Sequence, residues 1–472
     1  MRQGRNVPGA DARQDHSMAS RADNIASTLS LANFSKATEL KSRIWFTVGA
    51  LIVFRFLSFV PLPGVNPLIL QQLYSRTQGG ILDIFNTFSG GSLQRMSLIA
   101  LGVMPYITAS IVVQLASSLH PALAAMKKEG ESGRKKLNQY TRYGAVLLTA
   151  IQGYFVATGL EAYGASSGLQ AVVLPTMIFR ASAVISLIGG TMFLLWLGEQ
   201  ITSRGIGNGT SLIIMAGIVA QMPQFFTQLF EGGRSGSVSG FTIAGMILLV
   251  IGMILFISFM ERATRRLLIQ YPKRATQNGM MQADRSHLPL KINTAGVIPP
   301  IFASSLLLLP LTITQFAGKS VSPDSRMGQV IVTLNQYLGH GKPLYMALYA
   351  AGIVFFCFFY TAVVFNPEET ADNLKRNGGF IPGIRPGKNT ANYLDYVLTR
   401  ITVLGAAYIT IVCIVPEFFM EQTGLRLVVA GGTSLLIVVN VTVDTITQIQ
   451  SHLLAHQYGD LIKKAKLKGR LR

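Results

Sequence analysis

The side chains most able to form a functional site in this chain are polar ones inside long apolar runs. The run at 98–115, LIALGVMPYITASIVVQL, carries Thr108, Ser110 and Gln114. Its interior also contains Pro105, which removes one backbone hydrogen bond from a helix. Hydrocarbon cannot satisfy such polar groups, so they must face protein or water. The run therefore predicts an interrupted membrane helix that borders a path.

A second run shows the same pattern later in the chain. It begins at Asn293, has Pro299-Pro300 near its middle, and continues with Ser304-Ser305. Two interrupted helices at corresponding places in two halves of a membrane protein point to a central path. Ordinary packing through small and polar residues explains the same pattern equally well, so both interpretations stay open.

Catalytic and metal-binding patterns are missing from the sequence. GIRPGKN (383–389) resembles a phosphate loop but has Pro382 before it and Asn389 where Ser or Thr should stand. No nucleophile comes with a base, and the histidines lack metal-ligand spacing. Cys357 and Cys413 lie in apolar runs, which argues against a disulfide. We therefore expect a non-enzyme without cofactor or metal.

The composition indicates a multi-pass membrane protein. Of 472 residues, 50% are hydrophobic and 13% charged, with a mean hydropathy of +0.41. Ten runs are long enough to span: 44–60, 97–117, 142–160, 176–198, 209–230, 241–260, 294–316, 344–365, 397–416 and 426–447. Residues 1–43 are polar, so no cleavable signal peptide is expected, and Met18 is as plausible a start as Met1.

Basic residues predict the orientation of these runs. With a cytoplasmic N-terminus, 31 Lys and Arg fall on the cytoplasmic side and 7 on the other. Both termini are then cytoplasmic, and ten helices divide into inverted halves of five. The predicted parts are a tail at 1–43, a half at 44–230, a linker at 231–240, a half at 241–447 and a basic tail at 448–472.

Residues 61–96 are too polar to span but too apolar for a simple loop. Within GGILDIFNTFSGG, paired glycines at 79–80 and 90–91 flank a short helical segment and could act as hinges. One stripe of this segment is apolar: Ile81, Leu82, Ile84, Phe85 and Phe88. Asp83 and Asn86 lie off the stripe. A mobile stopper in a cavity and an amphipathic helix on the outer membrane surface both fit this pattern.

Long stretches of the chain resemble the SecY family, from about residue 40 to 470. The specific ones are FSGGSLQRMSLIALGVMPYITASIVVQL (88–115), KKEGESGRKKLNQYTRYG (127–144), LWLGEQITSRGIGNGTSLII (195–214), HLPLKINTAGVIPPIFASS (287–305), FFCFFYTAVVFNPEETADNLKRNGGFIPGIRPGKNT (355–390) and GGTSLLIVVNVTVD (431–444). The resemblance implies an all-α membrane channel for unfolded polypeptides, made of two five-helix halves with a re-entrant plug helix. It also implies sideways release of apolar segments into lipid.

Local motif matches imply site residues. The pore ring comprises Val103, Ile107, Thr210, Ile214, Ile301 and Ile437. Thr210 departs from the apolar residue usual in the family. The plug lies within 79–95, and the lateral gate lies between helices 2–3 and 7–8. Gate residues are Thr108, Gln114, Asn293 and Ser305. An apolar ring gates by dewetting and holds no fixed charge for ions.

The resemblance also implies binding partners and a cellular location. Arg385, in the loop 366–396, is expected to contact the ribosome or the motor SecA, as are Lys273 and Arg274 in the docking arm 261–293. Further expected partners are SecE, SecG, SecDF, YidC, signal peptides and unfolded client proteins, in a bacterial inner membrane. The basic tail KKAKLKGR (463–470) suits ribosomal RNA or anionic lipid.

Two other functions remain as alternatives from the residues alone. A secondary transporter of a small solute also has paired halves and broken helices, but it usually keeps ionisable residues at the midplane. A structural scaffold needs neither ring nor docking loop. Arg55, inside the first span, is expected to snorkel outward or pair locally rather than line the path.

Overall fold

The computed structural model describes residues 38–66, 86–167, 172, 175–236, 239–271, 275–276, 279–280, 285–317, 342–423 and 431–469, with isolated positions at 329, 333 and 337. Of the predicted site, residues 81–85, 273 and 274 lie outside these ranges. The described chain is mostly helical, in agreement with its apolar runs.

Two groups of helices correspond to the two predicted halves. The first comprises α3 (Thr38–Leu57), α6 (Met104–Leu119), α7 (Pro121–Lys128), α8 (Glu131–Ser167), α9 (Thr176–Arg204), α10 (Gly209–Val219) and α11 (Met222–Arg234). The second comprises α12 (Gly240–Arg262), α13 (Ile298–Ala317), α15 (Pro343–Val364), α16 (Pro367–Arg376), α17 (Lys388–Thr423) and α18 (Gly432–Gly469).

By length and composition, seven helices in the described residues are able to cross a membrane, or eight if the bent pair of α6 and α7 forms one span. That pair bends by 104° at its break. The two other predicted spans coincide with α3 and with α13, whose stretch Ile298–Leu307 is apolar. The multi-pass helical fold is therefore present, while the count of ten stays a prediction.

All three prolines that we expected to interrupt helices lie in first turns instead. α6 begins at Met104 rather than near residue 97, so Pro105 occupies its first turn. α13 begins at Ile298, which places Pro299 and Pro300 in its first turn. An N–H in the first turn has no intrahelical acceptor, so proline costs nothing there and its fixed φ favours the helix. The prediction of helices broken in mid-span was wrong at these positions.

The predicted docking arm contains strands that the all-α prediction did not include. β1 (Thr264–Gln270) pairs antiparallel with β4 (Arg285–Lys291), and the short strands β2 (Ala275–Thr276) and β3 (Gly279–Met280) pair further out. The far end of β1 also exchanges backbone hydrogen bonds with the loop after α16, where Gln270 N donates to the Phe380 oxygen at 2.9 Å. The arm is therefore joined to the predicted loop 366–396, which also contains Arg385.

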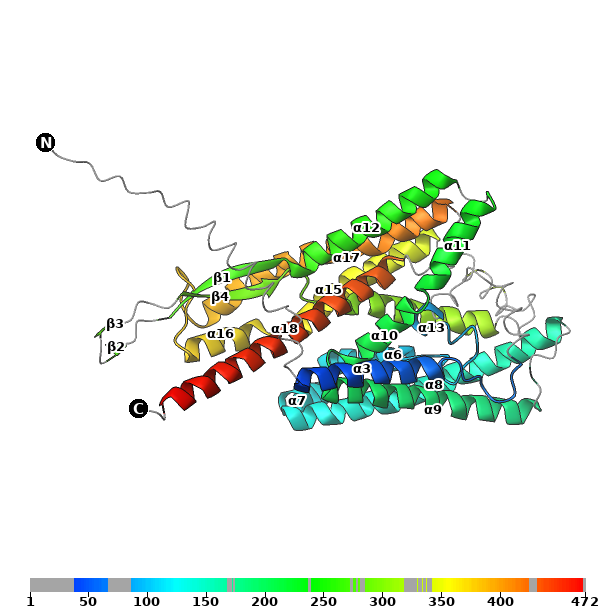
Figure 1. Ribbon diagram of the computed structural model, residues 1–472, viewed down its shortest axis with the longest axis horizontal. Coiled ribbons are helices and arrows are strands. Elements are labelled where there is room, and N and C mark those ends of the chain that lie inside the picture. Colours follow the sequence, from blue (N-terminus) through cyan, green and yellow to red (C-terminus); the bar gives the residue numbers. More distant parts are fainter. Residues whose placement is uncertain are drawn as a thin grey trace.

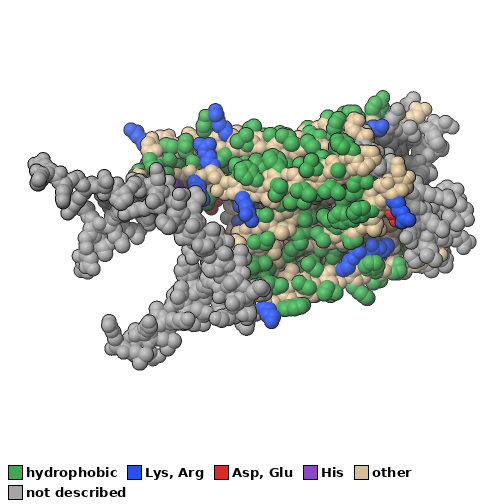
Figure 2. Space-filling model, turned by 45° about the horizontal axis from the view of Figure 1, so that its top comes forward, with side chains coloured by type: hydrophobic (Ala, Val, Ile, Leu, Met, Phe, Trp, Pro, Cys, Tyr) green, Lys and Arg blue, Asp and Glu red, His purple; other side chains and the backbone are tan. Residues whose placement is uncertain are grey.

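The helices run broadly along the long axis of the molecule (Figure 1). The start of α3, α7, α16, the β1–β4 pair and the C-terminal part of α18 lie at one end, and α11 lies at the other. Segments predicted to be cytoplasmic thus lie at one end of the molecule, and the assignment of that end to the cytoplasm stays a prediction. Figure 2 shows hydrophobic side chains covering the middle of one face, with basic side chains toward its ends, as a membrane-embedded surface requires.

The two groups of helices meet along two seams. On one side α6 and α8 contact α13, and on the other α10 contacts α18. Within each group neighbouring helices pack together, as α8 does with α9 and α13 with α15. A central region between the two seams is thus bordered by helices from both halves.

Candidate functional site

The centre of the molecule is one continuous apolar cluster that includes five of the six predicted ring residues. Val103, Ile214, Ile301 and Ile437 belong to it, and each has at most 8% of its surface exposed. Ile107 is half-buried and packs against this cluster and against a second one in the other half. The contributing elements are α6 with its preceding turn, α10, α13 and α18.

Thr210 behaves differently from the other predicted ring residues. It lies in the first turn of α10, one turn before Ile214, and is half-buried. Its hydroxyl donates to Asn208 Oδ1 at 2.7 Å, and the same oxygen accepts from the Thr210 and Ser211 amides. The hydroxyl is therefore satisfied at the helix cap, which explains how a polar residue is tolerated here.

The described end of the plug segment packs into the same cluster. Phe88 is 7% exposed and is a member of it, and Asn86 is also buried. Residues Asn86–Phe88 form a single helical turn, followed by turns up to Met104. Ile81, Leu82, Asp83, Ile84 and Phe85 lie outside the described residues, so the apolar stripe stays a prediction for them.

Gly90 and Gly91 form a tight turn that packs closely against α10. Both have positive φ, at 70° and 81°, a conformation that favours glycine. Gly91 N donates to the Asn86 oxygen at 2.8 Å. A Cβ on Gly90 would lie 3.0 Å from Gly217 Cα, so the backbones of the turn and α10 touch. The turn is therefore packed in this conformation, and a hinge at 90–91 stays a prediction.

Two arginines, Arg55 and Arg95, lie beside this turn. Arg55 Nη1 donates to the Gly90 oxygen at 2.8 Å, which is the local pairing expected for it. The Cζ atoms of Arg55 and Arg95 lie 4.8 Å and 4.1 Å from the Phe59 ring centroid. Burial lowers the pKa of Arg95, which lies outside the spanning helices, and the positive charge of Arg55 lowers it further.

The predicted gate residues lie on both sides of the seam between α6 and α13. Thr108 and Gln114 are on α6, and Ser305 is on α13. Thr108 and Ser305 are buried, and Gln114 is half-buried. Gln114 Nε2 donates to Ser110 Oγ at 3.2 Å. Gln114 Oε1 and Ser305 Oγ are buried without a hydrogen-bond partner among the described residues.

Asn293 is held by a carboxyl group that sequence reasoning missed. Its Nδ2 donates to Glu261 Oε1 at 2.6 Å, and its Oδ1 accepts from Gly296 N at 2.9 Å. Both side chains are buried, at 5% and 7% exposed. Glu261 lies in the last turn of α12, where an acid among basic residues was the available signal. The pair joins the end of α12 to the segment that enters α13.

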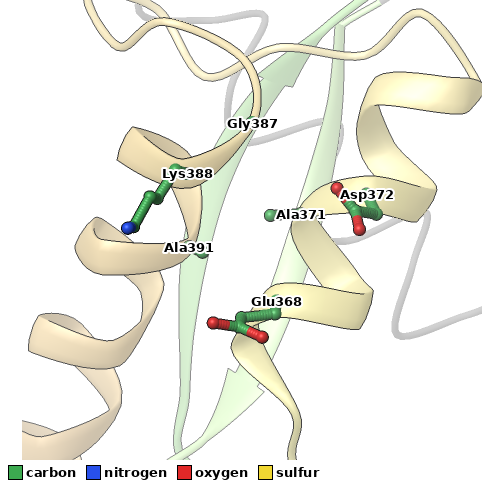
Figure 3. A pocket seen from close by; sticks show the side chains of 6 residues that line it. All are labelled: Glu368, Ala371, Asp372, Gly387, Lys388 and Ala391. Carbon is green, nitrogen blue, oxygen red and sulfur yellow. The ribbon is translucent and has the colours of Figure 1, made fainter.

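The predicted docking end combines Arg385 with a small cavity. Arg385 is exposed in the turn before α17, and its carbonyl accepts from Thr390 Oγ1 at 3.0 Å. Beside this turn a cavity of about 180 Å³ lies between α16 and α17 (Figure 3). Its lining is formed by Glu368, Ala371, Asp372, Gly387, Lys388 and Ala391. A separate apolar cluster joins β1, β4, α16 and the start of α17, so the docking end is one packed unit.

Comparison with known proteins gives a consistent assignment. The SecY family model matches residues 97–446. The chain is 52% identical over 435 residues to the protein translocase subunit SecY of Vibrio cholerae, covering 92% of this chain and 96% of that protein.

Solved structures share the fold. One, described as showing that the plug domain of SecY stabilises the closed state of the translocation channel and maintains a membrane seal, matches with a TM-score of 0.62. It is 16% identical and covers 88% of this chain and 92% of that one. Another, Sec61 in the canine ribosome-channel complex from the endoplasmic reticulum, has a TM-score of 0.59 at 15% identity, with the same coverage.

We predict that Asn293→Ala lowers the stability of the protein by about 2 kcal/mol, because the buried Glu261 carboxyl loses its amide donor. The measurement is thermal unfolding of the purified protein in detergent. Thr294→Ala is the control, since the Thr294 hydroxyl donates only to the Lys291 carbonyl at 3.2 Å. Equal shifts in the two variants would contradict the assigned role of the pair.

Proposed function

The chain belongs to the SecY family and is the protein-conducting channel subunit of the Sec translocase, and we propose that clients cross it through the central apolar cluster at Val103, Ile107, Ile214, Ile301 and Ile437. It is a multi-pass membrane protein and a transporter rather than an enzyme. The supporting observation is that one buried cluster contains side chains from both halves of the molecule.

The chemistry of the cluster suits a seal that must open for a chain. Apolar walls repel water from a narrow constriction, and no fixed charge attracts ions. Branched side chains such as Ile and Val have few rotamers, so they close again on a defined shape. An extended polypeptide that displaces them meets no charged group in the proposed ring, so its apolar segments are not held by electrostatic attraction.

A solute transporter is the weaker alternative for this site. Such a protein uses ionisable or polar ligands at the midplane to bind its solute or coupling ion. The five ring residues above carry no polar side-chain atom, and Thr210 directs its hydroxyl to its own helix cap. The site therefore offers little to a small polar solute.

We place the lateral gate at the seam of α6 and α8 with α13. The buried Gln114 Oε1 and Ser305 Oγ have no partner among the described residues, and an unpaired buried polar atom costs about 1–3 kcal/mol. Opening this seam gives both atoms access to water or to a client backbone. The closed seam is thus less stable than a fully apolar one, which favours sideways opening toward lipid.

The segment 79–95 is proposed as the plug on the outer side of the ring. Phe88 lies in the sealing cluster, and the turn that follows it packs on α10, the helix that carries Ile214. The two halves are proposed to be 44–230 and 241–447, joined by the linker 231–240.

The docking end is proposed to bind the motor SecA and the ribosome. Arg385 is exposed beside a cavity whose carboxylates, Glu368 and Asp372, suit a basic group of a partner (Figure 3). Lys273 and Arg274 of the docking arm are further proposed contacts. Family membership supports SecE, SecG, SecDF, YidC, anionic lipid and signal peptides as partners, and a bacterial inner membrane with both termini in the cytoplasm.

The path is tested by crosslinking from a photoreactive residue at position 107 to a secretory chain stalled in the channel. We expect an adduct with the stalled chain, because Ile107 borders the apolar clusters of both halves. Position 185 on α9 is the control, since Ile185 is 70% exposed on the outside of the helix group. Adducts at 185 and none at 107 would place the path elsewhere.

Ile437→Glu is expected to raise the resting ion conductance of the channel in planar bilayers by about tenfold or more. Ile437 is 1% exposed within the cluster, and a carboxylate there draws in water and cations. Ile437→Leu keeps the volume and should stay tight. An ion-tight Ile437→Glu channel at normal abundance would remove this residue from the seal.

Arg385→Glu is expected to reduce export of periplasmic proteins about tenfold without raising ion conductance, because the exposed cation at 385 would pair with an acidic group of the partner, which a carboxylate repels, and the seal stays intact. Lys375→Glu, an exposed charge reversal at the end of α16, is the control. Export and tightness that are unchanged by Arg385→Glu would show that this turn is not the docking contact.

A further inference from the structure

We propose that Arg55 and Gln221 are positioning residues that anchor the turn 86–91 to the first half of the molecule, so that the Gly90-Gly91 end of the plug segment stays fixed on α10. This inference rests on the proposed role of residues 79–95 as the plug. It assigns a fixed end to that segment and names the side chains that hold it.

Two hydrogen bonds fix the turn from two different helices. Arg55 Nη1, near the end of α3, donates to the Gly90 oxygen at 2.8 Å. Gln221 Nε2, at the break between α10 and α11, donates to the Asn86 oxygen at 2.6 Å. Gln221 is 8% exposed, so its bond is shielded from water. The Arg55 bond carries a charge on its donor, which makes it stronger than a neutral one.

The turn is also closed by its own hydrogen bonds. The Asn86 oxygen that accepts from Gln221 accepts from Gly91 N as well, at 2.8 Å. The Asn86 side-chain oxygen accepts from Gln94 N at 2.9 Å, which ties the start of the turn to the chain that leads into α6. The backbone of residues 86–94 is therefore restrained by several hydrogen bonds, which limit its rotation.

Close backbone packing sets the turn directly against a ring helix. A Cβ on Gly217 would lie 3.0 Å from the Phe88 oxygen and 3.2 Å from Gly90 N. Gly217 lies on α10 about one turn after Ile214, so the anchor and the seal share one helix. A displacement of this turn would thus also move Phe88, which belongs to the central apolar cluster.

Ser58 and Phe59 hold the Arg55 guanidinium in position to bond Gly90. Arg55 Nη1 lies 3.5 Å from Ser58 Oγ, and the guanidinium stands over the Phe59 ring. Arg95 covers the same ring and reaches the Ser58 oxygen at 3.5 Å. Among the described residues neither arginine has a carboxylate within ion-pair distance. The charged guanidinium of Arg55 therefore has the Gly90 carbonyl of the proposed plug segment as its hydrogen-bond acceptor.

The first test uses the purified channel with its companion subunits in planar bilayers. Arg55→Ala and Gln221→Ala are each expected to raise resting ion conductance about tenfold, as the loss of one shielded or charge-assisted hydrogen bond allows. Arg55→Lys keeps a cationic donor and should stay close to the parent. Arg180→Ala is the matched control, because Arg180 pairs with Glu161 at 2.6 Å on α8 and α9, away from the turn.

An epistasis arm separates anchoring from a general loss of folding. In a channel lacking residues 81–90, Arg55→Ala should add no further conductance, since its acceptor on Gly90 is gone. If Arg55→Ala still adds conductance there, the residue acts on overall stability and the anchor is refuted. If the deletion itself leaves the channel tight, the plug proposal fails. If the deletion leaks while Arg55→Ala and Gln221→Ala stay tight, only the anchor fails.

A second variant pushes the turn without removing a bond. Gly217→Ala favours the helix by intrinsic propensity but places a methyl group against the Phe88 oxygen and Gly90 N. We expect raised resting conductance with no loss of thermal stability. Gly252→Ala is the control, because a Cβ at that position of α12 meets nothing within 4 Å. A tight Gly217→Ala channel would overturn the close packing on which the anchor depends.

Discussion

Contact between apolar side chains of two separate helix groups is the interaction on which the rest of this structure depends. Ile107 and Ile214 from one group and Ile301 and Ile437 from the other share one buried cluster. In the function proposed above, this cluster has to exclude ions and still separate when a chain passes. Dispersion contacts meet both demands because each is small and none is directional. Charged or hydrogen-bonded contacts at this place would hold the halves together or attract ions.

Two sets of polar interactions lie next to the cluster. Arg55 and Gln221 hold the turn after Phe88 on the outer side. Glu261 and Asn293 join α12 to the entry of α13. Each pair connects segments next to the seal, where a directional bond fixes position without crossing the path. The molecule thus separates the tasks of sealing and of positioning between two kinds of contact.

Sequence alone predicted the multi-pass helical fold and the family, because apolar runs and family motifs are local signals. Four of the six residues predicted for the ring lie in one buried apolar cluster, and their role as a ring stays a proposal. The prediction failed where the structural effect of a residue depends on the position at which a helix begins. Pro105 and Pro299 seemed to interrupt helices, since the apolar runs start before the helices do. Long-range pairs were also hidden: Gln221 and Asn86 are 135 positions apart, and no periodicity connects them. The β1–β4 pair was missed within a loop that was read as a docking arm.

The short connection between β4 and α13 has a mechanical consequence. β4 ends at Lys291 and α13 begins at Ile298, while Ile292 N bonds to the Ala263 oxygen at 3.1 Å. Asn293, between them, is bonded to Glu261 and Gly296. In the function proposed above, a force applied by a partner to the β1–β4 pair would therefore be passed through this short connection directly to the first turn of α13. The same helix carries Ile301 of the proposed ring and Ser305 of the proposed lateral gate, so docking and gating would be coupled through one helix.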